Sequence, residues 1–216
     1  MTRTYRNRMS VAHEWSRITD WCGTHAPVTA AAMQPGLSEN TIAEYEASTG
    51  FDWPAELKDL YRLQNGSVTH DDRTGLFLGS VLPDKFLYPL DVAVEIRLNL
   101  LEAWDEIIYE NVELYAEDEM DLRDGDEAGT AANMFIPSYL PFAGLDEYHY
   151  FVDTRAGALH NCVTEYAQES RDTGGPIWAS ISVMLAAHAS ALEEGSVLGV
   201  WKPVVSKGVL EWEVEA

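Results

Sequence analysis

Two cysteines and six histidines are the side chains in this sequence with the greatest capacity for chemistry. Cys22-x-x-His25 and His160-x-Cys162 together offer two thiolates and two imidazoles, which are ligands that suit zinc. Neither pair has the context of a zinc finger, and the pairs come from distant segments. We therefore expect no metal site, with Cys22 facing a core and Cys162 lying in a strand.

Motifs for catalysis or cofactor binding are missing from the sequence. Ser196 in the run Gly-Ser-Val-Leu-Gly stands one place too early for a nucleophile elbow, and no P-loop or dinucleotide fingerprint occurs. Close carboxylate pairs such as Glu102 with Glu106 are expected by chance among 36 acidic residues. We therefore predict no catalytic residues and no cofactor, and a small enzyme is the least favoured class.

The charge balance is strongly acidic. The 36 acidic residues face 14 basic ones, which gives a formal net charge of −22. Between Asp91 and Thr130 there are 14 acidic residues and two basic ones. The first 17 residues instead hold one acid, Glu14, and four arginines, Arg3, Arg6, Arg8 and Arg17. Such a charge repels nucleic acid and anionic membranes, and it attracts basic partners.

The acidic segment allows two interpretations that the sequence leaves open. It is either a solvated surface, useful for solubility or adaptation to salt, or the docking site of a basic partner. Under the second interpretation, seven residues are the predicted partner contacts: Glu117, Asp118, Glu119, Asp121, Asp124, Asp126 and Glu127.

A cytoplasmic location is the expectation from cysteine usage and hydropathy. Two cysteines are too few for a disulfide framework, so a reducing compartment fits best. No apolar region follows the N-terminal arginines, and no apolar run is long enough to span a bilayer. We expect no membrane association, and the sequence leaves the oligomeric state open.

The N-terminal part is predicted to be helical. Residues 10–22 have the pattern of an amphipathic helix because Val11, Trp15 and Ile18 fall on one face. Residues 24–36 are rich in Ala, Pro and Thr, which favours a linker.

Two further helices follow. Ser38 is expected to cap a helix that ends at Gly50, and Pro54 is expected in the first turn of the next helix. Asn65-Gly66 is predicted to form the C-cap of that helix.

The later part alternates strands and helices without a strict βαβ order, which favours the α+β class. Asp91 is expected to cap a long acidic helix that reaches Tyr109, and residues 116–132 are predicted to form a solvated or mobile loop. A final helix is predicted from Trp178 to Leu192. Strands are predicted at residues 76–78, 86–88, 134–136, 139–143 and 148–152, then up to Tyr166, and in a hairpin over 197–214.

Several short motifs, taken in order, resemble the SUKH superfamily, the proteins related to fungal Smi/Knr-type cell-wall regulators. The motifs are, in order, a helix, a large apolar residue followed by proline, and a second helix that stops at Asn-Gly. A strand that contains a proline and a strand that ends in aspartate come later in the chain. The residues that carry them here, with an expected structural role, are Trp53, Pro54, Asn65, Gly66, Pro137, Asp153 and Gly157.

The resemblance implies a curved, mainly antiparallel sheet packed against helices. It covers residues 37–194, so we expect an N-terminal helix and linker over 1–36, a SUKH-like domain over 37–194 and a C-terminal β-hairpin extension over 195–216.

The resemblance also implies a non-catalytic protein-binding role. In bacteria such proteins look like immunity proteins that neutralise polymorphic toxins, many of them nucleases. Our first hypothesis is therefore an inhibitor that binds a basic toxin domain directly. The alternative is a regulatory adaptor or scaffold of the cell-wall-regulator type.

Overall fold

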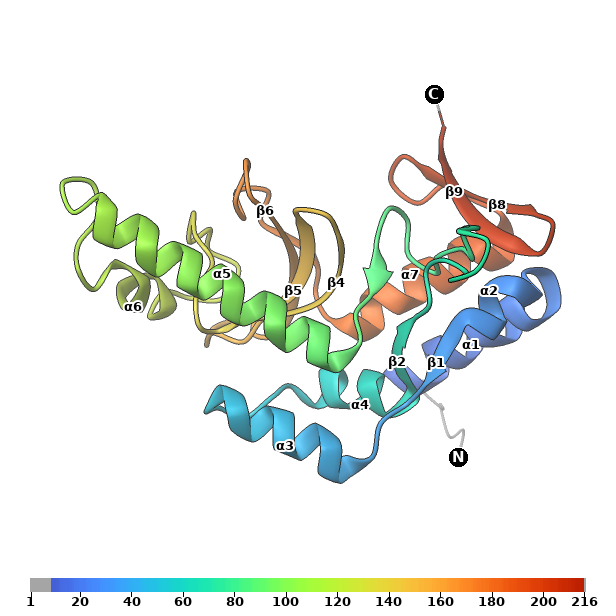
Figure 1. Ribbon diagram of the computed structural model, residues 1–216, viewed down its shortest axis with the longest axis horizontal. Coiled ribbons are helices and arrows are strands. Elements are labelled where there is room, and N and C mark those ends of the chain that lie inside the picture. Colours follow the sequence, from blue (N-terminus) through green and yellow to red (C-terminus); the bar gives the residue numbers. More distant parts are fainter. Residues whose placement is uncertain (1–8, 216) are drawn as a thin grey trace, which may run out of the picture.

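The computed structural model describes residues 9–215, and within them helices and antiparallel sheets form the expected α+β fold (Figure 1). Arg3, Arg6 and Arg8 lie outside the described residues. The largest sheet has five strands in the order β3-β4-β5-β6-β7, and each neighbouring pair is antiparallel. Its strands are β3 Phe86–Leu87, β4 Tyr139–Leu145, β5 Tyr148–Asp153, β6 Cys162–Ala167 and β7 Pro176–Trp178.

This sheet separates two hydrophobic cores. Successive side chains of a strand point to opposite faces, so Leu140 and Phe142 of β4 enter one core while Tyr139 enters the other. The first core also receives α1 Val11–His25, α4 Ala55–Leu63 and α7 Ile181–Glu194. The second core is mainly aromatic: Trp104, Phe135, Tyr139, Phe151 and Tyr166.

The predicted first helix is confirmed as α1. Its Val11, Trp15, Ile18 and Cys22 are buried on one face, and the Ser10 hydroxyl caps it by accepting a bond from the His13 backbone N–H at 3.2 Å.

The predicted linker over residues 24–36 is wrong. The segment forms α2 Pro27–Ala32 and β1 Met33–Pro35, and β1 pairs with β2 Gln64–Ser67. Pro27 suits the first helical turn, and alanine has the highest helix propensity. The Thr29 hydroxyl then fixes the helix, donating to the Leu78 carbonyl and accepting from the Leu210 N–H, both at 2.8 Å.

The capping prediction for α3 Glu39–Thr49 is confirmed. The Ser38 hydroxyl accepts a bond from the Thr41 N–H at 3.2 Å, and Gly50 ends the helix in the left-handed region with φ 81°.

The prediction that Asn65-Gly66 caps α4 is wrong. Pro54 stands at the N-cap position of α4, and Gln64 ends the helix in an extended conformation. Gln64 passes directly into β2, because the chain pairs with β1 there. Asn65 instead caps the next long helix, since its Oδ1 accepts a bond from the Leu90 N–H at 2.8 Å.

The long acidic helix is α5 Leu90–Glu110. Pro89, rather than Asp91, occupies its N-cap position. Leu90 lies in the first core and Trp104 in the second, so one helix joins the two cores. Arg97 is buried, and its guanidinium donates to the Pro137 carbonyl at 2.6 Å.

Two predictions for residues 116–136 are wrong. The expected solvated loop contains a helix, α6 Glu119–Asp124, and buries Ala128 and Ala132. Residues 134–136 form no strand, and their side chains fill the second core. These buried small and apolar residues hold the acidic segment against the sheet.

The closing elements largely follow the prediction. Trp178 lies in β7 rather than in the final helix, which begins at Ile181 after the N-cap Ser180. The predicted hairpin is confirmed as β8 Trp201–Ser206 and β9 Val209–Val214. Within residues 9–215, no helix is both long and apolar enough to cross a membrane.

Candidate protein-binding surface

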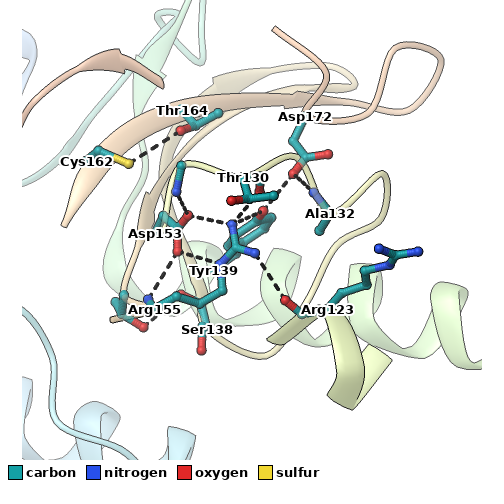
Figure 2. Close-up of polar contacts among 12 residues, drawn as sticks. Arg123, Thr130, Ala132, Ser138, Tyr139, Asp153, Arg155, Cys162, Thr164 and Asp172 are labelled. Carbon is teal, nitrogen blue, oxygen red and sulfur yellow. Dashed lines mark hydrogen bonds and ion pairs between the residues drawn. The ribbon is translucent and has the colours of Figure 1, made fainter. Parts of the chain in front are cut away.

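A buried ion pair stands at the end of the central strand β5 (Figure 2). Arg155 donates from Nη2 to Asp153 Oδ2 at 2.7 Å and from Nε to Asp153 Oδ1 at 3.0 Å. Both side chains are 1% exposed. Burial by itself lowers the pKa of Arg155, but its bonds to Asp153 outweigh burial and raise that pKa. The guanidinium is therefore charged, and its two bonds to Asp153 hold the pair in one geometry.

This ion pair fixes the backbone of the acidic segment. Arg155 donates from Nη1 to the Arg123 carbonyl at 3.1 Å and from Nη2 to the Thr130 carbonyl at 2.6 Å. Asp153 accepts a bond from the Gly129 N–H at 2.8 Å. The acidic segment is thus bonded to the end of β5 at residue 123 and again at residues 129 and 130.

Asp172 binds the next stretch of the same segment. It is 1% exposed and accepts bonds from the backbone N–H groups of Ala132 and Asn133, each at 2.7 Å. It also accepts from the Tyr139 hydroxyl at 2.6 Å, and burial together with this carboxylate raises the pKa of Tyr139. Figure 2 shows Asp153, Arg155 and Tyr139 next to Thr130, and Asp172 next to Ala132, so these groups together anchor the acidic segment.

Three of the seven predicted contact residues are engaged within the protein. Glu119 accepts bonds from Arg123, with Oε1 at 2.9 Å from Nε and 2.8 Å from Nη2. Asp124 accepts from the Ser138 N–H at 2.8 Å, and Asp126 lies 4.0 Å from the Arg123 guanidinium. These three carboxylates help to hold α6 in place.

The other four predicted contact residues, Glu117, Asp118, Asp121 and Glu127, are exposed to solvent. The last turn of α5 and the following turn add exposed Glu106, Glu110 and Glu113. No basic residue occurs anywhere between Arg97 and Arg123, so nothing in this stretch of chain neutralises the carboxylates.

Large apolar side chains stand among these carboxylates. Tyr109 is 82% exposed, Leu114 78% and Val112 68%, and Leu122 of α6 is also exposed. Tyr109 and Val112 also line a hollow of about 550 Å³ between the end of α5 and α6. Its lining residues are Asp105, Ile108, Tyr109, Val112, Tyr115, Ala116, Glu117 and Met120.

We call this region the α5–α6 surface: the hollow, the exposed Tyr109, Val112, Leu114 and Leu122, and the exposed carboxylates Glu113, Glu117, Asp118 and Asp121. Contiguous exposed apolar groups with a polar rim are typical of protein-binding sites. The sequence reasoning weighed only charge and missed the apolar members. The sequence does hold one indication that these side chains are exposed. Their spacing after Tyr109 is uneven, so it fits the buried face of neither a helix nor a strand.

The family-motif residues lie elsewhere, in contacts between elements. The Trp53 indole N–H donates to Thr49 Oγ1 at 2.8 Å, and the Pro54 carbonyl accepts from the Leu57 N–H at 3.1 Å. The Pro137 carbonyl accepts from Arg97, as described above.

Gly66 and Gly157 occupy tight backbone positions. Gly66 has φ 77°, and a Cβ there would lie 2.5 Å from the Pro89 nitrogen. Gly157 has φ 126° and lies close to the Glu127 side chain. Gly157 therefore packs against the acidic segment from the turn that follows Arg155.

The two cysteines occupy buried, unreactive positions. Cys22 faces the first core, and burial raises the pKa of its thiol to about 12. Cys162 begins β6, and burial raises its pKa too. Low-pKa, exposed thiolates are the reactive ones. Among residues 9–215, no three His, Cys, Asp or Glu side chains are grouped in a way that would hold a metal ion.

The fold is of the α+β class, and α6 lies near one end of the long axis of the molecule (Figure 1). The chain belongs to the SMI1 / KNR4 family (SUKH-1), whose family model matches residues 36–187. This confirms the resemblance found in the motifs. Membership supports a non-catalytic domain of immunity or regulator type, because the family is generally non-enzymatic. No curated protein sequence matches the chain.

Proposed function

We propose that the protein is an immunity protein that neutralises a basic toxin domain by direct binding, and that the α5–α6 surface is its docking site. The observation that carries the proposal is the combination, on one surface, of exposed apolar side chains with exposed carboxylates that have no ion pair within residues 9–215. Family membership supports the immunity role, and the location we propose is the cytoplasm.

Burial of the apolar side chains of this surface would provide the favourable free energy of binding. Removing apolar area from water yields roughly 25 cal/mol per Å². Tyr109, Val112 and Leu114 are more than two-thirds exposed, so each has apolar area to bury. Tyrosine is also enriched in interfaces, because it combines a large apolar ring with a polar tip.

The carboxylates determine which partner is favoured. A negative rim increases the association rate of a positive partner and repels a negative one. A nuclease must bind phosphate, and its binding groove is therefore positively charged. An acidic surface with a central apolar anchor can occupy such a groove and exclude the nucleic acid.

The chain that follows the surface is already ordered, which limits the entropy lost on binding. Arg155, Asp153 and Asp172 fix the backbone of residues 123–133, directly after the α6 residues of the surface. A surface that is already ordered loses little conformational freedom when a partner docks. The family also includes regulators, so a regulatory adaptor that uses the same surface is the second candidate.

The test is capture from lysate of the organism's own cells, with the products of neighbouring genes co-expressed and the bound proteins identified by mass spectrometry. We expect one dominant basic partner, and a salt increase from about 0.05 to about 0.5 M should weaken its binding at least tenfold. The triple variant Glu117→Lys, Asp118→Lys, Asp121→Lys should lose the same partner.

The control is a second triple variant, Glu44→Lys, Asp72→Lys, Glu194→Lys. It makes the same change of charge at exposed residues away from the α5–α6 surface. This control should keep the partner. Equal losses in both triple variants would reject the α5–α6 surface as the site. A partner that stays bound at high salt would reject the electrostatic part, and a cell-wall or signalling partner would favour the adaptor.

A further inference from the structure

A second hollow, of about 350 Å³, lies where the β8–β9 hairpin meets the loop before β3. The β8–β9 hairpin lies near the other end of the long axis from α6 (Figure 1). His70, Phe77 and Phe86 line it from the loop and β3, and Trp201, Leu210 and Trp212 line it from the hairpin. We call it the hairpin groove.

Aromatic rings dominate the walls of the hairpin groove and are held in place. The ring centroids of His70 and Phe77 are 5.6 Å apart, and those of Phe77 and Phe86 are 5.8 Å apart in an edge-to-face arrangement. On the opposite wall, the Trp212 indole N–H donates to the Ser80 carbonyl at 3.1 Å. The Ser80 N–H in turn donates to the Leu210 carbonyl at 3.3 Å, so the two walls are bonded to each other.

The charge in the hairpin groove is negative. Asp84 and Glu211 line it and are exposed, and within residues 9–215 neither has a hydrogen bond or ion pair through its side chain. Lys85 also lines it, but its amine is buried, lies 2.7 Å from Glu165 and sits over the Tyr150 ring at 4.5 Å. The lysine charge is thus already compensated, whereas the two carboxylates are not.

Aromatic faces and free carboxylates are complementary to a cation. The ring face carries negative potential, and a guanidinium both stacks on aromatic rings and bonds to carboxylates. The volume is at the lower end for ligand cavities, about 300–1,000 Å³, so it fits one or two side chains and not a helix. Leu82, Leu145 and Leu210 form an apolar part beside the rings.

We propose that the hairpin groove binds an arginine side chain, presented by an extended peptide with an apolar residue next to it. Trp201 and Trp212 lie outside the family match over residues 36–187, so this site is a feature that the hairpin adds to the family fold. It is separate from the α5–α6 surface, and neither proposal depends on the other.

The test is a titration of the full chain, labelled with ¹⁵N, against capped tripeptides. The probes are acetyl-Leu-Arg-Leu-amide and acetyl-Leu-Gln-Leu-amide, and the readout is the indole N–H signals of Trp201 and Trp212. We expect both signals to shift with the arginine peptide, which should bind about tenfold more tightly than the glutamine peptide. Equal affinity for both peptides, or no shift of either signal, would overturn the proposal.

Charge-neutralised variants locate the site. Asp84→Asn with Glu211→Gln should weaken binding of the arginine peptide at least about fivefold. The matched control is Asp72→Asn with Glu213→Gln, which alters the same regions of chain but no residue that lines the groove. The control should keep the affinity of the unmodified chain. Equal weakening in both pairs would reject the groove and indicate attraction by the overall charge.

Discussion

Arg155 is a single side chain whose five donated bonds link a strand end, a tyrosine and the acidic segment. These bonds give the buried guanidinium hydrogen-bond partners on every side. Its charge is compensated mainly by the directly bonded Asp153, and Asp172 adds to this. The acidic segment therefore depends on Arg155 together with these two carboxylates.

Replacing Arg155 by methionine should lower the free energy of unfolding by about 3–5 kcal/mol, because Asp153 would be left as an uncompensated buried charge. The measurement is urea denaturation followed by circular dichroism. Arg73→Met is the control, since Arg73 is exposed and its side chain has no ion pair within residues 9–215. The control should change stability by less than about 0.5 kcal/mol. A comparable loss in both variants would disprove this role of Arg155.

His188 is a second residue with an unusual environment. It lies on α7, fully buried between Trp178 and Trp212, with ring centroids at 5.6 and 6.2 Å. Its Nδ1 donates to the Met184 carbonyl at 2.7 Å, so Nδ1 carries the proton, and Nε2 has no partner among residues 9–215. Burial lowers the pKa of His188 to about 4.

This pKa predicts a loss of stability in acid. Between pH 6.5 and about 4 the unfolded chain binds a proton at His188 that the folded chain does not bind, so folding weakens as the pH falls through this window. The loss is roughly 3 kcal/mol by pH 4 and is absent above pH 7. His188→Phe should flatten this part of the stability curve, measured by urea denaturation at each pH. A parallel curve for the variant would contradict the assignment.

At the scale of elements, Gly66 determines how β2 and α5 meet. It combines a left-handed φ with contact to the ring of Pro89. Gly50 has almost the same φ, 81°, but a Cβ at that position would meet nothing within 4 Å. The two glycines thus separate the cost of the conformation from the cost of the contact.

Gly50→Ala should cost about 1–2 kcal/mol, the usual penalty for a left-handed alanine. Gly66→Ala should cost at least about 2 kcal/mol more, because its Cβ forces the start of α5 to move. Thermal unfolding of both variants under one condition gives the comparison. Equal costs would show that Pro89 moves away freely.

Local patterns in the sequence predicted those elements whose ends are determined by neighbouring residues. Ser38 and Gly50 bound α3 because a hydroxyl cap and a left-handed glycine act within one turn. The β8–β9 hairpin was predictable for the same reason, since Lys207 and Gly208 both adopt positive φ in its turn.

Elements that depend on distant partners escaped prediction. The α2 helix is fixed by bonds from Thr29 to residues 78 and 210, and the α6 segment by Arg155 and Asp172. These contacts join residues far apart in the chain, so no local pattern in the sequence predicts them. The candidate site was predicted in part: its charge was evident from composition, but its exposed Tyr109 and Leu114 depend on where α5 leaves the core.

At the scale of the whole molecule, the net charge of −22 opposes folding through self-repulsion. Salt screens this repulsion over roughly 10 Å at 0.1 M. We therefore expect the melting temperature to rise by several degrees when NaCl increases from about 0.02 to about 0.2 M. Differential scanning calorimetry at constant pH checks this. A melting temperature that falls with salt would mean that the internal ion pairs outweigh the repulsion.

The joint between α2 and β9 has a consequence for synthesis of the protein in the cell. The Val28 N–H donates to the Gly208 carbonyl at 2.9 Å, and Thr29 bonds to Leu210, 181 positions later in the chain. A ribosome adds about 5–20 residues per second, so the N-terminal helices wait roughly 10–40 seconds for these partners. During translation the apolar faces of these helices are accessible to chaperones. The contacts between α2 and the C-terminal hairpin can form only after the hairpin has been synthesised.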